Sequence, residues 1–367
     1  MEKDVVERFE SYLKNVKEND TLAVGYHVFC TDGVCSALIT VKSLERLLKR
    51  KITLTKGFLP FDADSILNWV KENKINKLIL VDLGIHVDVS FMKELEKITE
   101  TLVLDHHEFK KDWQSEKIAF VHATLLNKEV QSNQYPASKM AFDLFSKKVN
   151  IEDLDWIAAI GLVSDSSYTA WKEFVEVVIK KYHLEQNEDV FKSKLGFIAK
   201  HVGALWMFKE KEDAEKTFKI LYNVKSYKDI LKNNELADAK KIFDDEMAYW
   251  IDSRDKAEVF EKELILYHVK SKFDLSSPLS TVLSFKFFIG KTVLVIADTG
   301  KDTLKISARN QVGVRVNDLL GKAIEGIPDA VAGGHPQASS TTFKREYLET
   351  FKENLKREYK KLNLNKD

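Results

Sequence analysis

The fold is decided by residues 77–107, KLILVDLGIHVDVSFMKELEKITETLVLDHH. This stretch contains two apolar runs, and each is followed directly by an aspartate, Asp82 or Asp105. Between the two runs, apolar residues recur at helical spacing over 91–98. A buried strand, a helix and a second buried strand predict two parallel strands joined by a crossover helix. In sheets of this kind, ligands bind outside the carboxyl ends of the strands.

The same alternation extends towards the N-terminus. Apolar runs at 21–25 and 52–55 indicate two more strands, and helical patterns follow them at 34–48 and 64–72. The sequence therefore predicts an α/β domain with a parallel sheet and helices on both faces.

The hydrophobic pattern of the sequence changes further along the chain. Residues 136–260 have a strongly helical pattern, in which 238–262 indicates a long connecting helix. After this region, short apolar runs alternate with helical patterns again, which predicts a second, smaller α/β unit with strands at 264–267, 292–296 and 303–307 and helices at 316–323 and 345–362. We therefore expect three parts, 1–190, 191–262 and 263–367.

The composition limits the classes of partner. Lys plus Arg and Asp plus Glu are equal at 57 each. A protein that wraps a long duplex usually has a basic excess, so the balance favours a small substrate or a strand end held in a pocket. No apolar run reaches the roughly 20 residues that a bilayer requires, and the start lacks a signal-peptide core. We expect a cytoplasmic location and no membrane contact.

Four residues are candidate metal ligands: Asp32, Asp82, His106 and Asp165. Buried aspartates at strand ends are costly to desolvate unless a cation or hydrogen bonds compensate. Carboxylates with one or two imidazoles suit Mn²⁺, and also Mg²⁺ with fewer nitrogens. A single strand-end aspartate is more often a helix N-cap, and a lone histidine is more often structural. Asp105-His106-His107 has no common capping role, which favours the metal site.

A second polar cluster lies far downstream, around Gly333, Gly334 and His335. Paired glycines let a backbone approach a ligand closely, and their N–H groups can form an anion-binding concavity. Arg309, two residues after Ser307 at the end of a predicted strand, offers a second phosphate contact. The alternatives are a plain glycine turn and an ordinary surface arginine.

The order and spacing of these clusters resemble the DHH phosphoesterases that carry a DHH-associated C-terminal domain, above all RecJ-like nucleases and nanoRNases. Thr31-Asp32-Gly33…Ser36 resembles the first motif of the family, Val81-Asp82-Leu83-Gly84 the second, Leu104-Asp105-His106-His107 the third and Gly161…Asp165 the fourth. Gly333-Gly334-His335 resembles the hallmark of the associated domain, and Ser307-Ala308-Arg309 its phosphate-contacting strand end.

The resemblance implies a two-domain clamp with a cleft between a DHH catalytic domain and a substrate-binding domain. Asp32, Asp82, His106 and Asp165 would hold Mn²⁺ or Mg²⁺, as one or two ions. His107 would act beside the scissile phosphate, and Asp105 would orient the histidines. The terminal phosphate of the substrate would be held by the downstream residues, Ser307, Arg309, Gly333, Gly334 and His335.

The chain departs from the family in the first motif. The family has an aspartate where this chain has Cys30, and many members have a histidine where it has Tyr26. His27 is adjacent, but in a regular strand it would face the opposite side. Cys30 could bind a metal as a thiolate, although sulfur favours zinc over manganese, or it could be a small buried side chain.

Two functions follow from this pattern. The first is a metal-dependent phosphodiesterase, a RecJ-like exonuclease that acts on the ends of single-stranded DNA or RNA or on short oligonucleotides. The second is a catalytically degenerate member that serves as a partner of replication or repair proteins, like the DHH-type subunit of eukaryotic replicative helicases. The intact motifs favour the first. A third interpretation, a small-molecule phosphatase or pyrophosphatase, shares the metal chemistry but fits the Gly-Gly-His hallmark less well.

Overall fold

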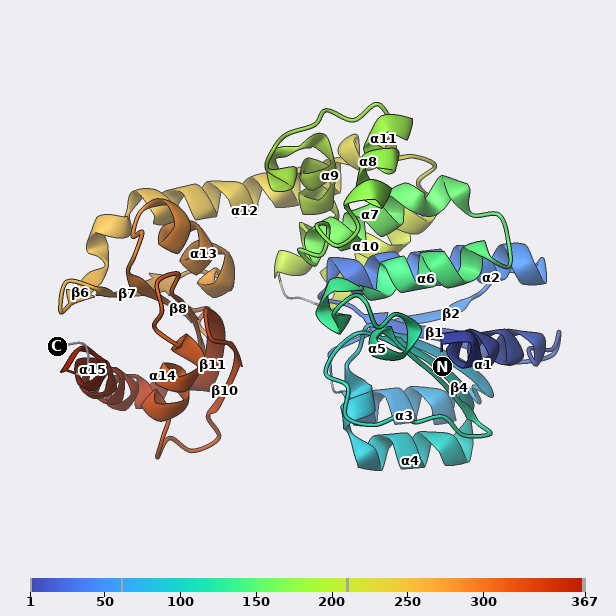
Figure 1. The fold of residues 1–367 in the computed structure, drawn as a ribbon, viewed down its shortest axis with the longest axis horizontal. Coiled ribbons are helices and arrows are strands. Elements are labelled where there is room, and N and C mark those ends of the chain that lie inside the picture. The colour runs from blue at the N-terminus through green and yellow to red at the C-terminus, as the bar shows by residue number, and fades with distance from the viewer. Residues whose placement is uncertain (1, 61, 209–210, 365–367) are drawn as a thin grey trace. The chain divides into compact units, whose positions relative to one another are not determined.

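The computed structural model describes residues 2–60, 62–208 and 211–364, and Figure 1 shows its fold. The chain divides into two compact units, Met1–Lys240 and Lys241–Asp367, here called the N-terminal and C-terminal units. Among the helices of the described residues, none is long and apolar enough to span a bilayer.

The N-terminal unit is built on a parallel sheet, as the sequence predicts. Its order is β2-β1-β3-β4-β5, with β1 (Leu22–His27), β2 (Leu54–Phe58), β3 (Lys77–Val81), β4 (Glu100–Asp105) and β5 (Ile118–His122). The chain moves outward from β1 to β2 and then returns to the other side of β1 as β3. This reversal lies between β1 and β3, and such a switch point is where ligands bind in open α/β sheets.

Helices cover both faces of this sheet. In Figure 1, α3 (Ala63–Glu72) and α4 (Val89–Ile98) lie on one face, and α2 (Thr31–Leu48) and α6 (Ala137–Ser146) lie on the other. Every residue of β3 and of β5 is consequently buried, which explains their continuous apolar runs. The unit also contains α1 (Glu2–Lys14), α5 (Ala123–Leu126), α7 (Asp155–Ser164), α8 (Lys172–Lys181), α9 (Lys194–Val202), α10 (Lys211–Asn223) and α11 (Tyr227–Leu231).

The C-terminal unit is a second α/β unit, also as predicted. Its mixed sheet has the order β10-β11-β9-β8-β7-β6, with β6 (Glu258–Phe260), β7 (Leu264–Lys270), β8 (Thr292–Asp298), β9 (Thr303–Arg309), β10 (Val331–His335) and β11 (Ala338–Lys344). Only β7 and β8 pair in parallel among these strands. The helices are α13 (Ser276–Lys286), α14 (Val316–Ala323) and α15 (Leu348–Leu364).

The long connecting helix is shorter than the sequence predicts. α12 (Asn234–Asp252) contains the boundary between the units and ends ten residues before Lys262, the expected end. The strand β6 occupies part of the expected helix and forms a hairpin with β7. Two of the three residues of the intervening turn, Glu261 and Lys262, have positive φ, at 48° and 63°. Glycine or asparagine usually marks such a turn, and neither is present to signal it.

Candidate metal centre

Asp82 is the centre of the site at the carboxyl edge of the parallel sheet. It follows β3 directly, is 1% exposed, and has a left-handed backbone with φ +59°. Its N–H donates to the carbonyl of Leu104, which holds this turn against the end of β4. A left-handed backbone is uncommon outside glycine and marks a position that its surroundings constrain.

His106 lies between two carboxylates. Its Nε2 is 3.1 Å from Asp82 Oδ1, and its Nδ1 is 3.8 Å from Asp165 Oδ2. Burial lowers the pKa of this imidazole, but the hydrogen bond to Asp82 and the surrounding carboxylates outweigh burial and raise the pKa to about 10. The surrounding carboxylates therefore favour a positive charge at this position.

Asp105 fixes the geometry of the histidines. Its Oδ2 accepts hydrogen bonds from the N–H groups of Leu83 (3.0 Å) and Gly84 (2.8 Å), and its Oδ1 accepts from the N–H of His107 (2.9 Å). The Nδ1 of His107 is 2.8 Å from the same Oδ1. Burial would raise the pKa of Asp105, but the hydrogen bonds and charges of His107 and His86 hold it well below its usual range.

His107 is positioned to meet a bound molecule, because its side chain is 36% exposed. Burial lowers its pKa, but the contact with Asp105 raises it to about 9. With Nδ1 held by Asp105, Nε2 is the nitrogen left to act on a ligand.

Asp32 is completely buried in the first turn of α2. Its two oxygens accept hydrogen bonds from the N–H groups of Ala137 (2.7 Å) and Ser138 (3.1 Å) at the start of α6. The residue before α6 is Pro136, whose side chain makes no capping bond, so Asp32 supplies that bond from another helix. Burial and the charges of Asp82 and Asp165 raise the pKa of Asp32 to about 8.

Asp165 follows the last residue of α7. Its side chain is 27% exposed, and burial together with the charge of Asp82 raises its pKa to about 6, against the opposing charges of His106 and His107. Gly161, one turn earlier, allows α7 to approach: a Cβ there would lie 2.0 Å from Ser138 Oγ and 2.7 Å from Asp32 Oδ1.

His27 faces the site, and the expectation that it faces the other way is wrong. Its Nδ1 is 3.7 Å from Asp82 Oδ2, because the left-handed turn at Asp82 places that carboxylate beside the end of β1. Tyr26 is instead buried against Phe218 of α10, with ring centroids 5.2 Å apart. Cys30, directly before α2, completes this side of the site. Burial and the carboxylates, Asp82 first, raise the pKa of its thiol.

Two further histidines support the site, and sequence reasoning missed both. The N–H of Thr124 donates to His122 Nδ1, so His122 Nε2 carries the proton and donates to the carbonyl of His107, 2.9 Å away. Burial lowers the pKa of His122 to about 4, which keeps it neutral. His86 lies with Nδ1 3.6 Å from Asp105 Oδ2. Neither histidine belongs to a local motif, so only the fold reveals their role.

The residues at this edge fit a divalent cation. Among the described residues, two groups of possible ligand atoms lie within 4.8 Å of one another: Asp82, His106 and His107, and His27, Cys30 and Asp82. Asp82 Oδ2, His106 Nδ1 and His27 Nδ1 are buried without a hydrogen-bond partner in the described part of the chain. Buried polar atoms are normally paired, so these three atoms are suited to bind a cation. Asp32 and Asp165 are outside both groups.

In the C-terminal unit, the predicted phosphate contacts lie in β9 and β10, which are separated by β11 in the sheet. Arg309 ends β9 and pairs with Ala338 of β11, which pairs in turn with His335 of β10. Gly333 and Gly334 precede His335 in the same strand, whose glycines hid it from sequence analysis. The side chain of His335 lies outside the described part of the structure.

Arg309 also lies at the start of α13. Its Nη2 donates to Ser277 Oγ at 3.0 Å, and Ser307 Oγ and Ser276 Oγ are 3.2 Å apart. Burial lowers the pKa of the guanidinium, although arginine stays charged at any pH of interest. An arginine and hydroxyls at a helix N-terminus form a suitable phosphate-binding group.

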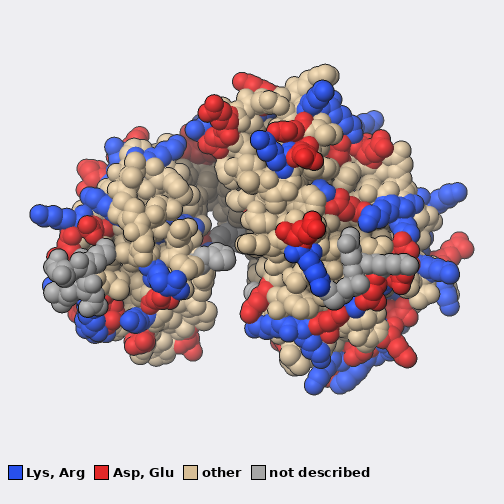
Figure 2. Space-filling view, in the orientation of Figure 1, with Lys and Arg blue, Asp and Glu red and all other residues tan. Residues whose placement is uncertain are grey.

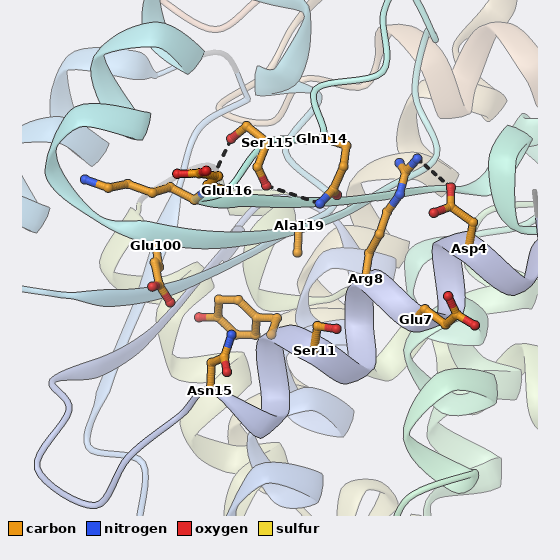
Figure 3. Close-up of a pocket in the computed structure, with 12 residues that line it drawn as sticks. Asp4, Glu7, Arg8, Ser11, Asn15, Glu100, Gln114, Ser115, Glu116 and Ala119 are labelled. Atoms are coloured by element: carbon orange, nitrogen blue, oxygen red, sulfur yellow. Dashed lines mark hydrogen bonds and ion pairs between the residues drawn. The ribbon is translucent and has the colours of Figure 1, made fainter.

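Other surface features of the two units lie apart from these residues. On the face that Figure 2 shows, positive and negative side chains are interspersed on each unit, in keeping with the balanced composition. Figure 3 shows a hollow beside α1 and the N-terminal ends of β4 and β5. Its volume is about 270 Å³. Arg8 in that hollow is already paired with Asp4 and Asp112. None of the candidate metal ligands lines it.

Comparisons with known proteins agree with this fold. The family model described as the DHHA1 domain matches residues 276–361. RecJ from Thermus thermophilus, solved with Mn²⁺, has a TM-score of 0.72 and 16% identity over 96% of this chain and 54% of its own. An exonuclease RecJ bound to manganese has a TM-score of 0.69 and 16% identity, and the match covers 96% of this chain and 93% of that one. CDC45 from Entamoeba histolytica has a TM-score of 0.56 and 11% identity, and the match covers 97% of this chain and 98% of that one. No curated protein matches the sequence.

The comparisons define one domain and the fold of the chain. Residues 276–361 match the DHHA1 domain. The parallel-sheet unit followed by this domain has the same fold as RecJ. The likeness at these identities is one of fold, and the chain spans about half the length of the Thermus RecJ.

Proposed function

We propose that this protein is a metal-dependent phosphodiesterase, a RecJ-like exonuclease that acts on the ends of single-stranded DNA or RNA or on short oligonucleotides. The observation that carries the proposal is the environment of Asp82. This buried carboxylate has His106 on one oxygen, and its second oxygen has no hydrogen-bond partner among the described residues. The chain shares its fold with RecJ bound to manganese.

Asp32, Asp82, His106 and Asp165 are the proposed ligands for Mn²⁺ or Mg²⁺. When bound, such an ion polarises a phosphoryl oxygen and makes hydroxide available near neutral pH. The raised pKa values support a cation here: burial and then neighbouring carboxylates raise those of Asp32 and Asp165, and the hydrogen bond to Asp82 and the nearby carboxylates raise that of His106. A cation would displace the proton of His106 and ionise both aspartates.

His107 is the proposed proton donor. Asp105 holds its Nδ1, so the partly exposed Nε2 can donate to a phosphate oxygen or to the leaving oxygen. A pKa of about 9 keeps this imidazole protonated at neutral pH, when a donor is required. Asp105 acts as a positioning residue, because it accepts hydrogen bonds from both the 83–84 turn and His107.

The C-terminal unit is proposed to bind the terminal phosphate of the substrate through Ser307, Arg309, Gly333, Gly334 and His335. Arg309 at the N-terminus of α13 supports this assignment, because both the guanidinium and the helix end attract anions. Zero net charge supports a strand end over a long duplex as the substrate. A cytoplasmic location and the division into 1–190, 191–262 and 263–367 remain part of the proposal.

A second candidate is a catalytically degenerate protein that binds replication or repair proteins. One observation favours it: Tyr26 and Cys30 replace family ligands, and Tyr26 is buried against Phe218 where it cannot bind a metal. The fold likeness to CDC45 is compatible with this alternative.

The test is hydrolysis of end-labelled single-stranded DNA and RNA with Mn²⁺ by the wild type, His106→Ala and Cys30→Asp. His183→Asn is the matched control, because His183 has positive φ, which asparagine tolerates, and lies in neither ligand group. We expect hydrolysis by the wild type and the control, and a loss of at least about 100-fold in His106→Ala. An inactive wild type would overturn the proposal. A gain in Cys30→Asp would then favour the degenerate partner.

A further inference from the structure

We infer that His27, Cys30 and Asp82 form a second cation site with a thiolate ligand, which binds Zn²⁺ in preference to Mn²⁺. The site lies at the switch point between β1 and β3. It uses His27, which does not occupy the histidine position of the family, and a sulfur where the family has a carboxylate.

The geometry requires little movement to bind an ion. The three ligand atoms lie within 4.8 Å of one another, and His27 Nδ1 is 3.7 Å from Asp82 Oδ2. In a tetrahedral site, two zinc–ligand bonds of roughly 2.0–2.3 Å place the ligand atoms about 3.3–3.8 Å apart. His27 Nδ1 and Asp82 Oδ2 already have this spacing, and side-chain movements of about 1 Å are enough to bring in the third ligand atom.

Two of the three ligand atoms accept or donate no hydrogen bond in the described part of the structure. His27 Nδ1 and Asp82 Oδ2 are both buried without a hydrogen-bond partner among the described residues. A buried polar atom without a hydrogen bond destabilises the folded state, and more so when it is charged, so a cation that binds both atoms is favoured. Asp82 Oδ1 already contacts His106, so this carboxylate can serve both ligand groups at once.

Cys30 occupies the N-cap position of α2, but its side chain does not cap the helix. It precedes α2 with extended backbone, φ −136° and ψ 131°, and its side chain makes no capping hydrogen bond. Serine, threonine, aspartate and asparagine are the usual residues at this position. Its sulfur is available to a cation instead, and its thiol proton would pass to solvent on binding.

Gly33 provides the space for this site. A Cβ there would lie 2.4 Å from the carbonyl oxygen of His27 and 3.1 Å from Asp82 Oδ2. No left-handed backbone explains this glycine, because its φ is not positive. Because Gly33 has no side chain, α2 can lie close to His27 and Asp82.

The donor set determines the metal. Thiolate is a soft ligand that suits zinc, whereas manganese favours oxygen ligands. One sulfur, one imidazole and one carboxylate leave a fourth position of a tetrahedral zinc ion open, as in zinc sites where water or substrate binds. The inference rests on the proposed metal centre only through Asp82, which both ligand groups share.

The experiment titrates the full chain, stripped of metal by a chelator, with Co²⁺ and follows the near-ultraviolet charge-transfer band that a thiolate gives when it binds cobalt. We expect the band in the wild type and its loss in Cys30→Ser, which keeps a good helix cap. Cys35→Ser is the matched control and should keep the band, because Cys35 is buried one turn further along α2. His27→Gln should weaken Co²⁺ affinity at least about tenfold.

Competition and X-ray absorption complete the test. Stoichiometric Zn²⁺ should remove the cobalt band, whereas Mn²⁺ should do so only in large excess. Zinc in the wild type should show a sulfur neighbour at about 2.3 Å. No band in the wild type, an unchanged band in Cys30→Ser, or no sulfur neighbour would overturn the inference. His106→Ala should keep the band while it loses hydrolysis, so the outcomes for this site and for the proposed function are separable.

Discussion

The replacement Asp105→Asn tests whether this carboxylate organises the metal centre. Asp105 is 1% exposed and accepts four contacts, two on each oxygen, from Leu83, Gly84 and His107. An asparagine keeps one oxygen, but its NH₂ group then faces the other pair of N–H donors. Two hydrogen bonds to a charged group are lost, each contributing about 1.5–3 kcal/mol. We therefore expect the free energy of unfolding to fall by about 3–6 kcal/mol.

Urea denaturation of the wild type and the variant, followed by circular dichroism at pH 7, measures this loss. Asp88→Asn is the matched control, because Asp88 caps α4 by accepting from the N–H groups of Ser90 and Phe91. Asparagine caps a helix about as well as aspartate, so the control should change stability by less than about 0.5 kcal/mol. A loss below about 1 kcal/mol in Asp105→Asn, or one equal to that of the control, would refute the organising role.

Three further predictions concern other parts of the structure. Gly161→Ala should lower stability by about 1–3 kcal/mol in urea denaturation, because the added Cβ would lie 2.7 Å from Ser138 Cβ and rotation of the serine cannot relieve this; an unchanged midpoint would contradict this packing. Arg309→Gln should weaken binding of an oligonucleotide with a terminal phosphate about tenfold, and should leave one without that phosphate less affected. The Arg345 hydrogen bonds lower the pKa of Asp298 to about 2, so this pair stabilises fully above about pH 4 and loses its effect as pH falls through about 2. Arg345→Gln should therefore show a smaller fall in melting temperature over that range than the wild type, and equal falls would count against the pair.

The sequence predicted the layers of the fold because those depend on local pattern. Apolar runs that end in aspartate placed Asp82 and Asp105 at the edge of a parallel sheet, where the structure has them. The helix expected at 316–323 has the same bounds in the structure. The glycines of β10 gave no strand pattern, and the turn at Glu261 carried no turn residue, so these elements were missed.

The details of the site depend on contacts between distant parts of the chain. No local pattern shows that Asp32 accepts from the first turn of α6, more than 100 residues later. The positive φ of Asp82 brings its carboxylate to His27, which strand alternation alone would send away from the metal ligands. Motifs could therefore nominate the ligands, but only the three-dimensional structure shows which atoms lie together.

A divalent cation held by Asp82 and His106 would appear in crystals of the full chain soaked in Mn²⁺ and measured by anomalous diffraction. We predict a manganese peak within bonding distance of an Asp82 carboxylate oxygen and an imidazole nitrogen of His106, and no such peak in His106→Ala. Manganese at saturating concentration that binds elsewhere, or nowhere, would contradict it.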